Sequence, residues 1–258
     1  MNTIEVIKNH RSIRKYKTTP IAEKELNSVL ECAIRASTTG NMQLYSIIVT
    51  QDEEKKRQLA PLHFNQLMVT QAPVLLTFCA DFNRFNKWCG LNNANPAYDN
   101  FLSFMTATID ALLAAQNACI AAESLGLGIC YLGTTLYHSE KIMEVLKLPK
   151  GVIPITAITL GYPSEMPELT DRLPSKAIIH YEEYVNFSSE EIIQLYSEKE
   201  DNAFYKNLVN ENKVANLAQV FTQKRYTKEN NINFSKSLIH LLQKQGFMNH
   251  EIEKNDDN

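Results

Sequence analysis

The stretch FLSFMTATIDALLAAQNACIAAESL, residues 101–125, decides the fold, because it is almost continuously apolar and helix-forming. At ~1.5 Å per residue, one helix of this length crosses most of a domain. About 20 apolar residues would also span a membrane. The stretch contains too many polar side chains for an isolated span in lipid, namely Thr106, Thr108, Asp110, Gln116, Asn117 and Glu123. We therefore expect a long helix buried in a core or against a second subunit, which is the main reason to expect an oligomer.

Helices and strands alternate on both sides of this stretch. β-branched and apolar runs predict strands at 45–50, 73–80, 129–132 and 152–160. Apolar residues at helical spacing predict helices over 26–34, from about Asp52, around Gln66 and over 138–146. This alternation predicts a mixed class, α/β or α+β, and we expect an α+β fold of the α/β type.

The composition changes near His180, after which Asn, Lys, Glu and Gln predominate. We expect a core domain over 1–182 and a C-terminal helical extension over 183–258, packed on the core or on a partner subunit. Helices are predicted over 188–197 and 237–243. The segment between them, 210–233, is polar and weakly patterned, which predicts a mobile region.

Charge and cysteine content restrict the cellular setting. The 258 residues have 44% hydrophobic and 21% charged side chains, a formal net charge of -3 and a pI near 6.1. Such a chain has no global field that would attract nucleic acid or an anionic membrane. Five widely spaced cysteines predict buried free thiols in a reducing compartment, namely Cys32, Cys79, Cys89, Cys119 and Cys130. With no apolar signal core at the N-terminus, we expect a cytoplasmic location.

The densest group of polar donors is HRSIR, in which His10, Arg11, Ser12 and Arg14 lie within five residues. Guanidinium groups match phosphate oxygens and stay charged in any environment, so this cluster suits a phosphorylated ligand. The alternative is an ordinary solvated basic turn. His138 and Glu140 have no further metal ligand at helical spacing, so no metal site is expected.

Four ordered motifs together resemble the nitroreductase family of flavoproteins, particularly its oxygen-insensitive NADPH nitroreductase and flavin reductase branch. They are HRSIR, the NMQ of STTGNMQ, LGLGICYLG, and GYP followed by DRLP. QAPVLLTFCADFNRF and AAQNACIAAESLGLG are also similar to that branch. The resemblance covers roughly residues 3–182 and returns weakly in LLQKQGF.

The resemblance implies a homodimer that binds FMN in two sites at the subunit interface. His10, Arg11, Ser12 and Arg14 would hold the phosphate and the flavin edge, and Arg14 would face the N1 and C2 carbonyl region, where a cation stabilises reduced flavin. Thr38, Thr39, Asn41 and Gln43 would contact the ribityl chain and ring, partly from the neighbouring subunit. The remaining implied contacts are Gln66, the turn of Tyr131, Leu132, Gly133 and Thr134, and Arg172 at the phosphate.

Two positions depart from the branch that the chain resembles. Thr170 stands where a lysine is usual, which weakens the expected grip on phosphate. Gly133 and Thr134 replace a common pair of glycines. For the 2′-phosphate of NADPH we expect Lys224 and Arg225, with solvated surface charges as the alternative. NADPH or NADH would be the co-substrate.

The expected function is an FMN-dependent NAD(P)H oxidoreductase that reduces nitroaromatics, quinones or related electron-poor acceptors by two-stage transfer. The FMN carries the chemistry, so no catalytic side chain is assigned. A dinucleotide Rossmann site is not expected, because no GxGxxG opens a helix after the first strand. The alternatives are an NAD(P)H:flavin reductase on the same scaffold and a non-catalytic flavin-binding protein.

Overall fold

The computed structural model describes residues 2–249 and divides the chain into two compact units. The first consists of residues up to Glu168 together with those from Lys236 onward, and the second is Leu169–Ser235. The predicted boundary between independent domains at 182 stays a prediction, and the compact units divide at 168 and again at 235.

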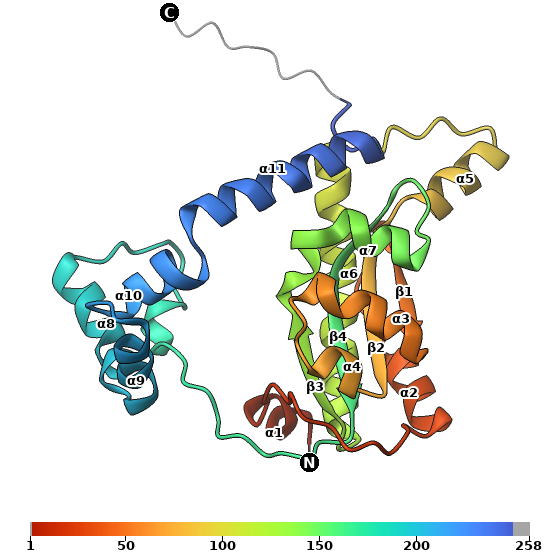
Figure 1. Ribbon diagram of the computed structural model, residues 1–258. Helices are drawn as coiled ribbons and strands as arrows, with labels where there is room; N and C mark the ends of the chain where they lie inside the picture. The colour runs from red at the N-terminus through yellow and green to blue at the C-terminus, as the bar shows by residue number, and fades with distance from the viewer. Residues whose placement is uncertain (1, 250–258) are drawn as a thin grey trace, which may run out of the picture. The chain divides into compact units, whose positions relative to one another are not determined.

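A four-stranded sheet forms the centre of the first unit (Figure 1). The strands are β1 (Tyr45–Thr50), β2 (Val74–Asp81), β3 (Gly128–Leu132) and β4 (Val152–Gly161). Their order is β1-β2-β4-β3, and every neighbouring pair is antiparallel. The predicted strands are confirmed. β2 and β4 are buried along their whole length because both are central strands with helices on each face.

Alternate residues of the sheet face two separate apolar cores. Leu76 packs in the core of α2 (Glu23–Ala33) and α6 (Phe101–Ser124), while its neighbour Leu75 packs on the opposite face. That second face carries α3 (Glu53–Leu59), α4 (Met68–Gln71) and α7 (Ser139–Leu146) (Figure 1). Two 3₁₀ helices accompany them, η2 (Ala60–His63) and η3 (Gly133–His138). The predicted α+β class is confirmed.

The remaining helices lie before, between and after these layers in sequence. They are α1 (Thr3–Lys8), η1 (Thr39–Asn41), α5 (Asn83–Leu91), η4 (Ser175–Ala177), α8 (Ser189–Asp201), α9 (Ala203–Asn212), α10 (Leu217–Gln219), the π-helical η5 (Val220–Arg225) and α11 (Lys228–Gln245). The division between the units falls within α11, whose Leu241 and Leu242 are buried in the core of the first unit. The segment 210–233, which is polar and weakly patterned in sequence, is mostly helical. Its mobility stays a prediction.

Helix α6 has one buried and one exposed face, although both are apolar. Alanines fill the buried face, which lets α2 and the sheet approach closely: Ala107, Ala111, Ala114, Ala118 and Ala122. Leu102, Ile109 and Leu112 are exposed, the first by 75%. The helix is long and apolar enough to cross a membrane, but core helices of soluble proteins can have the same length and composition. The expected long central helix is therefore confirmed, with one face left uncovered in a single copy of the chain.

Four of the five cysteines are buried, and the prediction is wrong for Cys32, which is exposed on the last turn of α2. Cys32 and its neighbour Glu31 are exposed, whereas Val29 and Ala33 of the same helix are buried in the core. Burial raises the pKa of the Cys79 and Cys119 thiols to about 12. These two groups therefore remain protonated at neutral pH, and they have no thiolate character.

Gly128 allows the HRSIR segment to lie directly on β3. The Ile13 N–H donates to the Ile129 carbonyl at 2.8 Å, and a Cβ at Gly128 would lie 2.7–2.9 Å from side-chain atoms of Ile13. We expect Gly128→Ala to lower the free energy of unfolding by about 1–3 kcal/mol, because the overpacked segment must shift. Urea denaturation measures this loss.

Gly90→Ala is the matched control, since a Cβ at that position in α5 meets no atom within 4 Å. Alanine is the better helix former, so this variant should be as stable as the wild type or slightly more stable. Equal stability of the two variants would contradict close packing at Gly128.

Candidate active site

The HRSIR segment is tied to the first unit at both of its ends. His10 Nδ1 lies 2.7 Å from Glu123 Oε1, at the end of α6. Arg11 donates from Nε to the Pro167 carbonyl and from Nη1 to the Asn9 carbonyl, both at 2.8 Å. These two side chains are therefore engaged in fixing the segment. Ser12 lies alongside Ile129 in a bridge of parallel sense.

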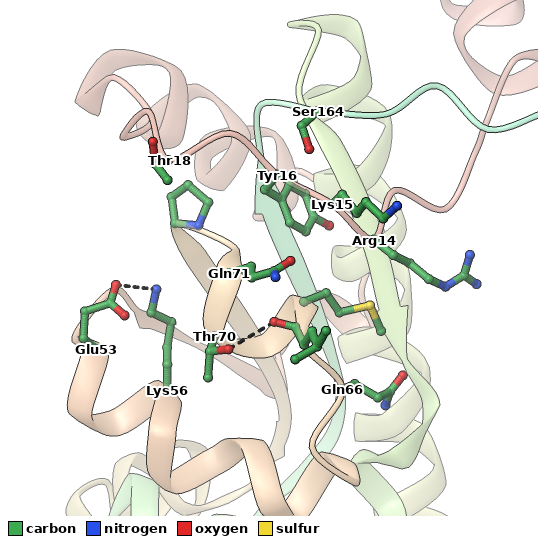
Figure 2. A pocket seen from close by; sticks show the side chains of 13 residues that line it. Arg14, Lys15, Tyr16, Thr18, Glu53, Lys56, Gln66, Thr70, Gln71 and Ser164 are labelled. Atoms are coloured by element: carbon green, nitrogen blue, oxygen red, sulfur yellow. Dashed lines mark hydrogen bonds and ion pairs between the residues drawn. The ribbon is translucent and has the colours of Figure 1, made fainter.

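Arg14 differs from its neighbours because its guanidinium is directed into open space. Its backbone N–H donates to Glu165 Oε1 at 2.8 Å, whereas no hydrogen bond of its guanidinium to another described residue is formed. Lys15 lies beside it, with Nζ 3.9 Å from Glu165 Oε2 (Figure 2). Arg14 is thus the cation of the motif that remains available to a ligand.

A cavity of about 820 Å³ lies beside these two cations (Figure 2). The N-terminal segment, α3, the residues of and before α4, and the chain after β4 form its walls: Arg14, Lys15, Tyr16, Thr18, Glu53, Lys56, Gln66, Leu67, Met68, Thr70, Gln71, Pro73 and Ser164. Arg14 and Gln66, predicted from separate parts of the sequence, are brought to this one cavity. Its volume is within the range of small-molecule sites.

Sequence reasoning missed Lys56, which is 1% exposed although it is a lysine in a charged helix. Its Nζ donates to the Ala72 carbonyl at 2.8 Å and pairs with Glu53 Oε1 at 2.7 Å (Figure 2). The run EEKKRQ is typical of a solvated helix face, so no local signal distinguishes Lys56 from Lys55. Lys56 joins α3 to the start of β2 and supports one wall of the cavity.

Tyr16 supplies a buried, uncharged wall. Its hydroxyl donates to the Ile13 carbonyl at 2.6 Å and lies 2.7 Å from Thr159 Oγ1. Burial raises the pKa of Tyr16 well above its usual value. The Tyr16 phenol therefore stays protonated. Its hydrogen bonds to Ile13 and Thr159 fix the backbone segment that carries Arg14 and Lys15.

The turn after β3 contacts Gln66 through the side chain of Thr134. Gln66 Nε2 donates to the His63 carbonyl at 3.0 Å and lies 3.5 Å from Thr134 Oγ1. Thr134 Oγ1 is also 2.8 Å from His63 Nδ1. Leu132 is buried, Gly133 begins η3, and the Tyr131 hydroxyl donates to Gln116 Oε1 at 3.3 Å. The structure therefore brings Gln66 and the predicted turn together.

The loop from Thr38 to Gln43 is organised by a carboxylate of α6. Thr38 precedes η1, and the N–H and hydroxyl of Thr39 both bond Asp110 Oδ1, at 2.9 and 3.2 Å. Asn41 and Gln43 have left-handed backbone, with φ of 57° and 55°, and the Gln43 amide donates to Asn41 Oδ1 at 3.2 Å. Asp110 is fully buried and was seen in the sequence only as a polar interruption.

This loop and HRSIR lie at diagonally opposite corners of the sheet. Gln43 precedes Tyr45 on edge strand β1, and Tyr45 pairs through Ala80 with Ile153 at the start of β4. Ser12 lies beside Ile129 on the other edge strand, and Ile129 pairs with Leu160 at the end of β4. The cavity has no lining residue from 38–43. One chain alone does not bring these predicted residues together.

The other candidate residues belong to the second compact unit and are described within it. Arg172 is exposed, and its Nη1 donates to Thr170 Oγ1 at 2.7 Å, so the threonine at the departing position holds this arginine. Lys224 and Arg225 are exposed at the end of η5, which is a π-helical turn. The roles of all three stay predictions.

The donors around the cavity fit the group that the sequence resemblance implies. Arg14 and Lys15 supply positive charge for an anion, and the Gln66 amide can bond the polar edge of a ring. Residues 2–249 contain no group of three or more His, Cys, Asp or Glu side chains that could hold a metal ion. FMN would be held here by Arg14 and Gln66, with Lys15 as an addition that sequence reasoning did not foresee.

Comparisons with known proteins place the chain in a family. The model of the Nitroreductase family matches residues 7–162. An FMN reductase (NADPH) of Bacillus subtilis is 40% identical over 185 residues, which are 71% of this chain and 74% of that protein. An oxygen-insensitive NADPH nitroreductase of Salmonella typhimurium is 35% identical and is covered over 80% of its length, with 76% of this chain.

Similarity extends to solved structures. The NfrA1 nitroreductase of B. subtilis superposes with a TM-score of 0.80 at 33% sequence identity, over 96% of this chain and all of that one. On these grounds the chain belongs to the nitroreductase family.

Proposed function

We propose that this oxidoreductase binds FMN and transfers electrons from NADPH or NADH to nitroaromatics, quinones or related electron-poor acceptors. The observation that carries the proposal is the convergence of Arg14 and Gln66 on one cavity. The names of two relatives, an FMN reductase (NADPH) and an oxygen-insensitive NADPH nitroreductase, support both the cofactor and the electron donor.

FMN, when bound, supplies the redox chemistry, since it accepts a hydride from the nicotinamide and passes two electrons to an acceptor. Arg14 would place a cation beside the N1 and C2 carbonyl edge, and Gln66 would orient the ring by its amide. Ser12 and Arg172 would add donors for the phosphate. His10 and Arg11, whose side chains are already engaged, would act mainly by holding this segment in place.

A second copy of the chain would complete the site. The Thr38–Gln43 loop lies at the corner of the sheet diagonally opposite HRSIR, so its proposed flavin contacts are made across a subunit interface. The exposed apolar face of α6, with Leu102, Ile109 and Leu112, offers surface for such an interface. A homodimer that acts on small molecules, without nucleic acid or membrane partners and in the cytoplasm, is the assembly proposed.

Flavin reductase activity is the second candidate within this function. The 40% identical FMN reductase of B. subtilis favours it. An open site shared by donor and acceptor discriminates weakly between acceptors, so free flavin and nitroaromatics are both suitable. Initial rates with free FMN, a nitrofuran and a benzoquinone, each with NADPH and with NADH, would rank these substrates.

We expect the purified protein to be yellow, and its flavin absorbance to bleach when NADPH is added without oxygen. Both results follow if a bound flavin can accept hydride from the nicotinamide. A yellow protein that NADPH does not bleach would instead be a flavin-binding protein without this activity. A colourless protein that takes up no added FMN would contradict the proposed cofactor.

A further inference from the structure

We propose that His63 is a positioning residue that fixes both Gln66 and the turn of Thr134 against the flavin. The inference rests on the proposed function, because it assigns a role within the same FMN site. His63 is the last residue of η2 and is 1% exposed. It does not line the cavity, so it would act only through its two neighbours.

His63 contacts the two candidate flavin segments with different atoms. Its ring Nδ1 lies 2.8 Å from Thr134 Oγ1, and its carbonyl accepts from Gln66 Nε2 at 3.0 Å. Gln66 Nε2 and Thr134 Oγ1 are themselves 3.5 Å apart, so His63, Gln66 and Thr134 each contact the other two. A single buried residue therefore joins a loop before α4 to the turn after β3.

These contacts also fix the orientation of the Gln66 amide. A carbonyl can only accept, so the atom facing the His63 carbonyl must be the amide nitrogen. The amide oxygen is thereby directed away from His63, and it remains able to accept from an N–H of a ligand. The His63 carbonyl is a backbone group that any residue at this position keeps, so the imidazole acts on the Gln66 amide only through Thr134.

The backbone between His63 and Gln66 needs such support. Phe64 and Asn65 both have left-handed backbone, with φ of 55° and 54°. This conformation is unfavourable for a bulky residue such as phenylalanine. Phe64 N–H donates to the Pro61 carbonyl at 3.1 Å, and Gln66 N–H donates to the His63 carbonyl at 3.2 Å. The geometry thus places His63 at the fixed end of a strained turn that carries Gln66.

The chemistry of the ring suits a hydroxyl partner. Burial, with a smaller effect of His138, lowers the pKa of His63 to about 4. The imidazole is therefore neutral at pH 7, and each ring nitrogen is either a donor or an acceptor. Thr134 can satisfy Nδ1 in either tautomer, since a hydroxyl both donates and accepts. A residue without a side-chain hydroxyl or other polar group could not satisfy Nδ1.

A double-mutant cycle tests whether His63 acts through Thr134. The FMN dissociation constant would be measured by fluorescence titration for the wild type, His63→Leu, Thr134→Val and the double variant. We expect each single variant to weaken FMN binding roughly three- to tenfold, the effect of one lost hydrogen bond. The double variant should bind no more weakly than the worse single variant. The inference would be overturned if the fold-losses of FMN affinity in the two single variants multiplied in the double variant. It would also be overturned if His63→Leu bound FMN as tightly as the wild type.

His63→Asn separates positioning from bulk packing. The asparagine side chain can place a polar atom near the Nδ1 position, so it should restore FMN binding to within about threefold of wild type. If His63→Leu does not fold, two other variants provide the test. FMN binding is measured for His63→Asn and Thr134→Val, and ¹⁵N NMR of the His63 ring is recorded for the wild type and Thr134→Val. Loss of the Thr134 hydroxyl should shift the Nδ1 resonance in the cofactor-free protein, and an unmoved resonance would overturn the proposed contact.

The outcomes distinguish this inference from the proposed function. If the wild type binds no FMN, the proposed function fails and the inference fails with it. If the wild type binds FMN and the cycle is additive, only the role of His63 is lost. Non-additive effects together with recovery in His63→Asn would support both.

Discussion

Arg14→Ala is expected to purify largely without flavin, with FMN affinity reduced about 10- to 100-fold. A hydrogen bond to a charged group contributes roughly 1.5–3 kcal/mol, which corresponds to this range. The loss should be large because no other described residue accepts a hydrogen bond from the Arg14 guanidinium, so the whole fork is available to the ligand. The ratio of absorbance at the flavin band to that at 280 nm gives cofactor retention, and titration gives the affinity.

Lys17→Ala is the control for a general loss of positive charge. Lys17 is an exposed cation three residues away, and it does not line the cavity. The Lys17→Ala variant should retain as much flavin as the wild type. Arg14→Lys should be intermediate, because an ammonium keeps the charge but lacks the planar fork. Full occupancy in Arg14→Ala would remove Arg14 from the site.

The central sheet and its helices could be predicted because their signals are local. Runs such as PVLLTFCA and VIPITAITL are apolar without interruption, as expected for strands with helices on both faces, and β2 and β4 have those positions. The connection of Arg14 with Gln66 was predicted only from ordered motifs. Nothing in the spacing of these residues requires them to meet.

The second compact unit was predicted in part: α8 matches the helix predicted over 188–197, whereas α9 and α10, which are shorter, were not predicted. α9 has no buried residue, and α10 has three residues in all. Their starts are nevertheless marked by side-chain caps, Asn202 bonding Phe204 N–H and Asn216 bonding Gln219 N–H. An asparagine before a polar segment can therefore mark the start of a helix.

The residues that support the site gave no sequence signal, because each depends on a distant partner. Asp110 bonds Thr39 and Leu44, more than sixty residues earlier, and His63 contacts Thr134 seventy-one residues later. A buried aspartate in an apolar helix indicates that some donors must meet it. Which donors they are is decided by the packing of α6 behind β1.

Asp110→Ala should destabilise the protein more than any other single change considered, by roughly 2–5 kcal/mol. Asp110 accepts from the Thr39 N–H at 2.9 Å, the Thr39 hydroxyl at 3.2 Å and the Leu44 N–H at 3.2 Å. The Leu44 N–H is buried, and leaving such a donor without a partner costs about 1–3 kcal/mol, to which the lost Thr39 bonds and the space left by the carboxylate add. Thermal and urea denaturation of the cofactor-free protein would measure the effect. Thr106→Ala, which removes only a bond within α6, should change stability by no more than about 0.5 kcal/mol.

Asp110→Asn then tests whether the loop serves the flavin site. The amide has the volume of the carboxylate but replaces one acceptor oxygen with a donor, so one of the loop N–H groups loses its partner. Since Gly40, Asn41 and Gln43 all have left-handed backbone, their conformation depends on these anchors. Where the variant is still fully folded, FMN should dissociate at least severalfold faster than from the wild type. An unchanged dissociation rate in a destabilised variant would mean that Asp110 supports the core alone, and that the loop does not reach the cofactor of either subunit.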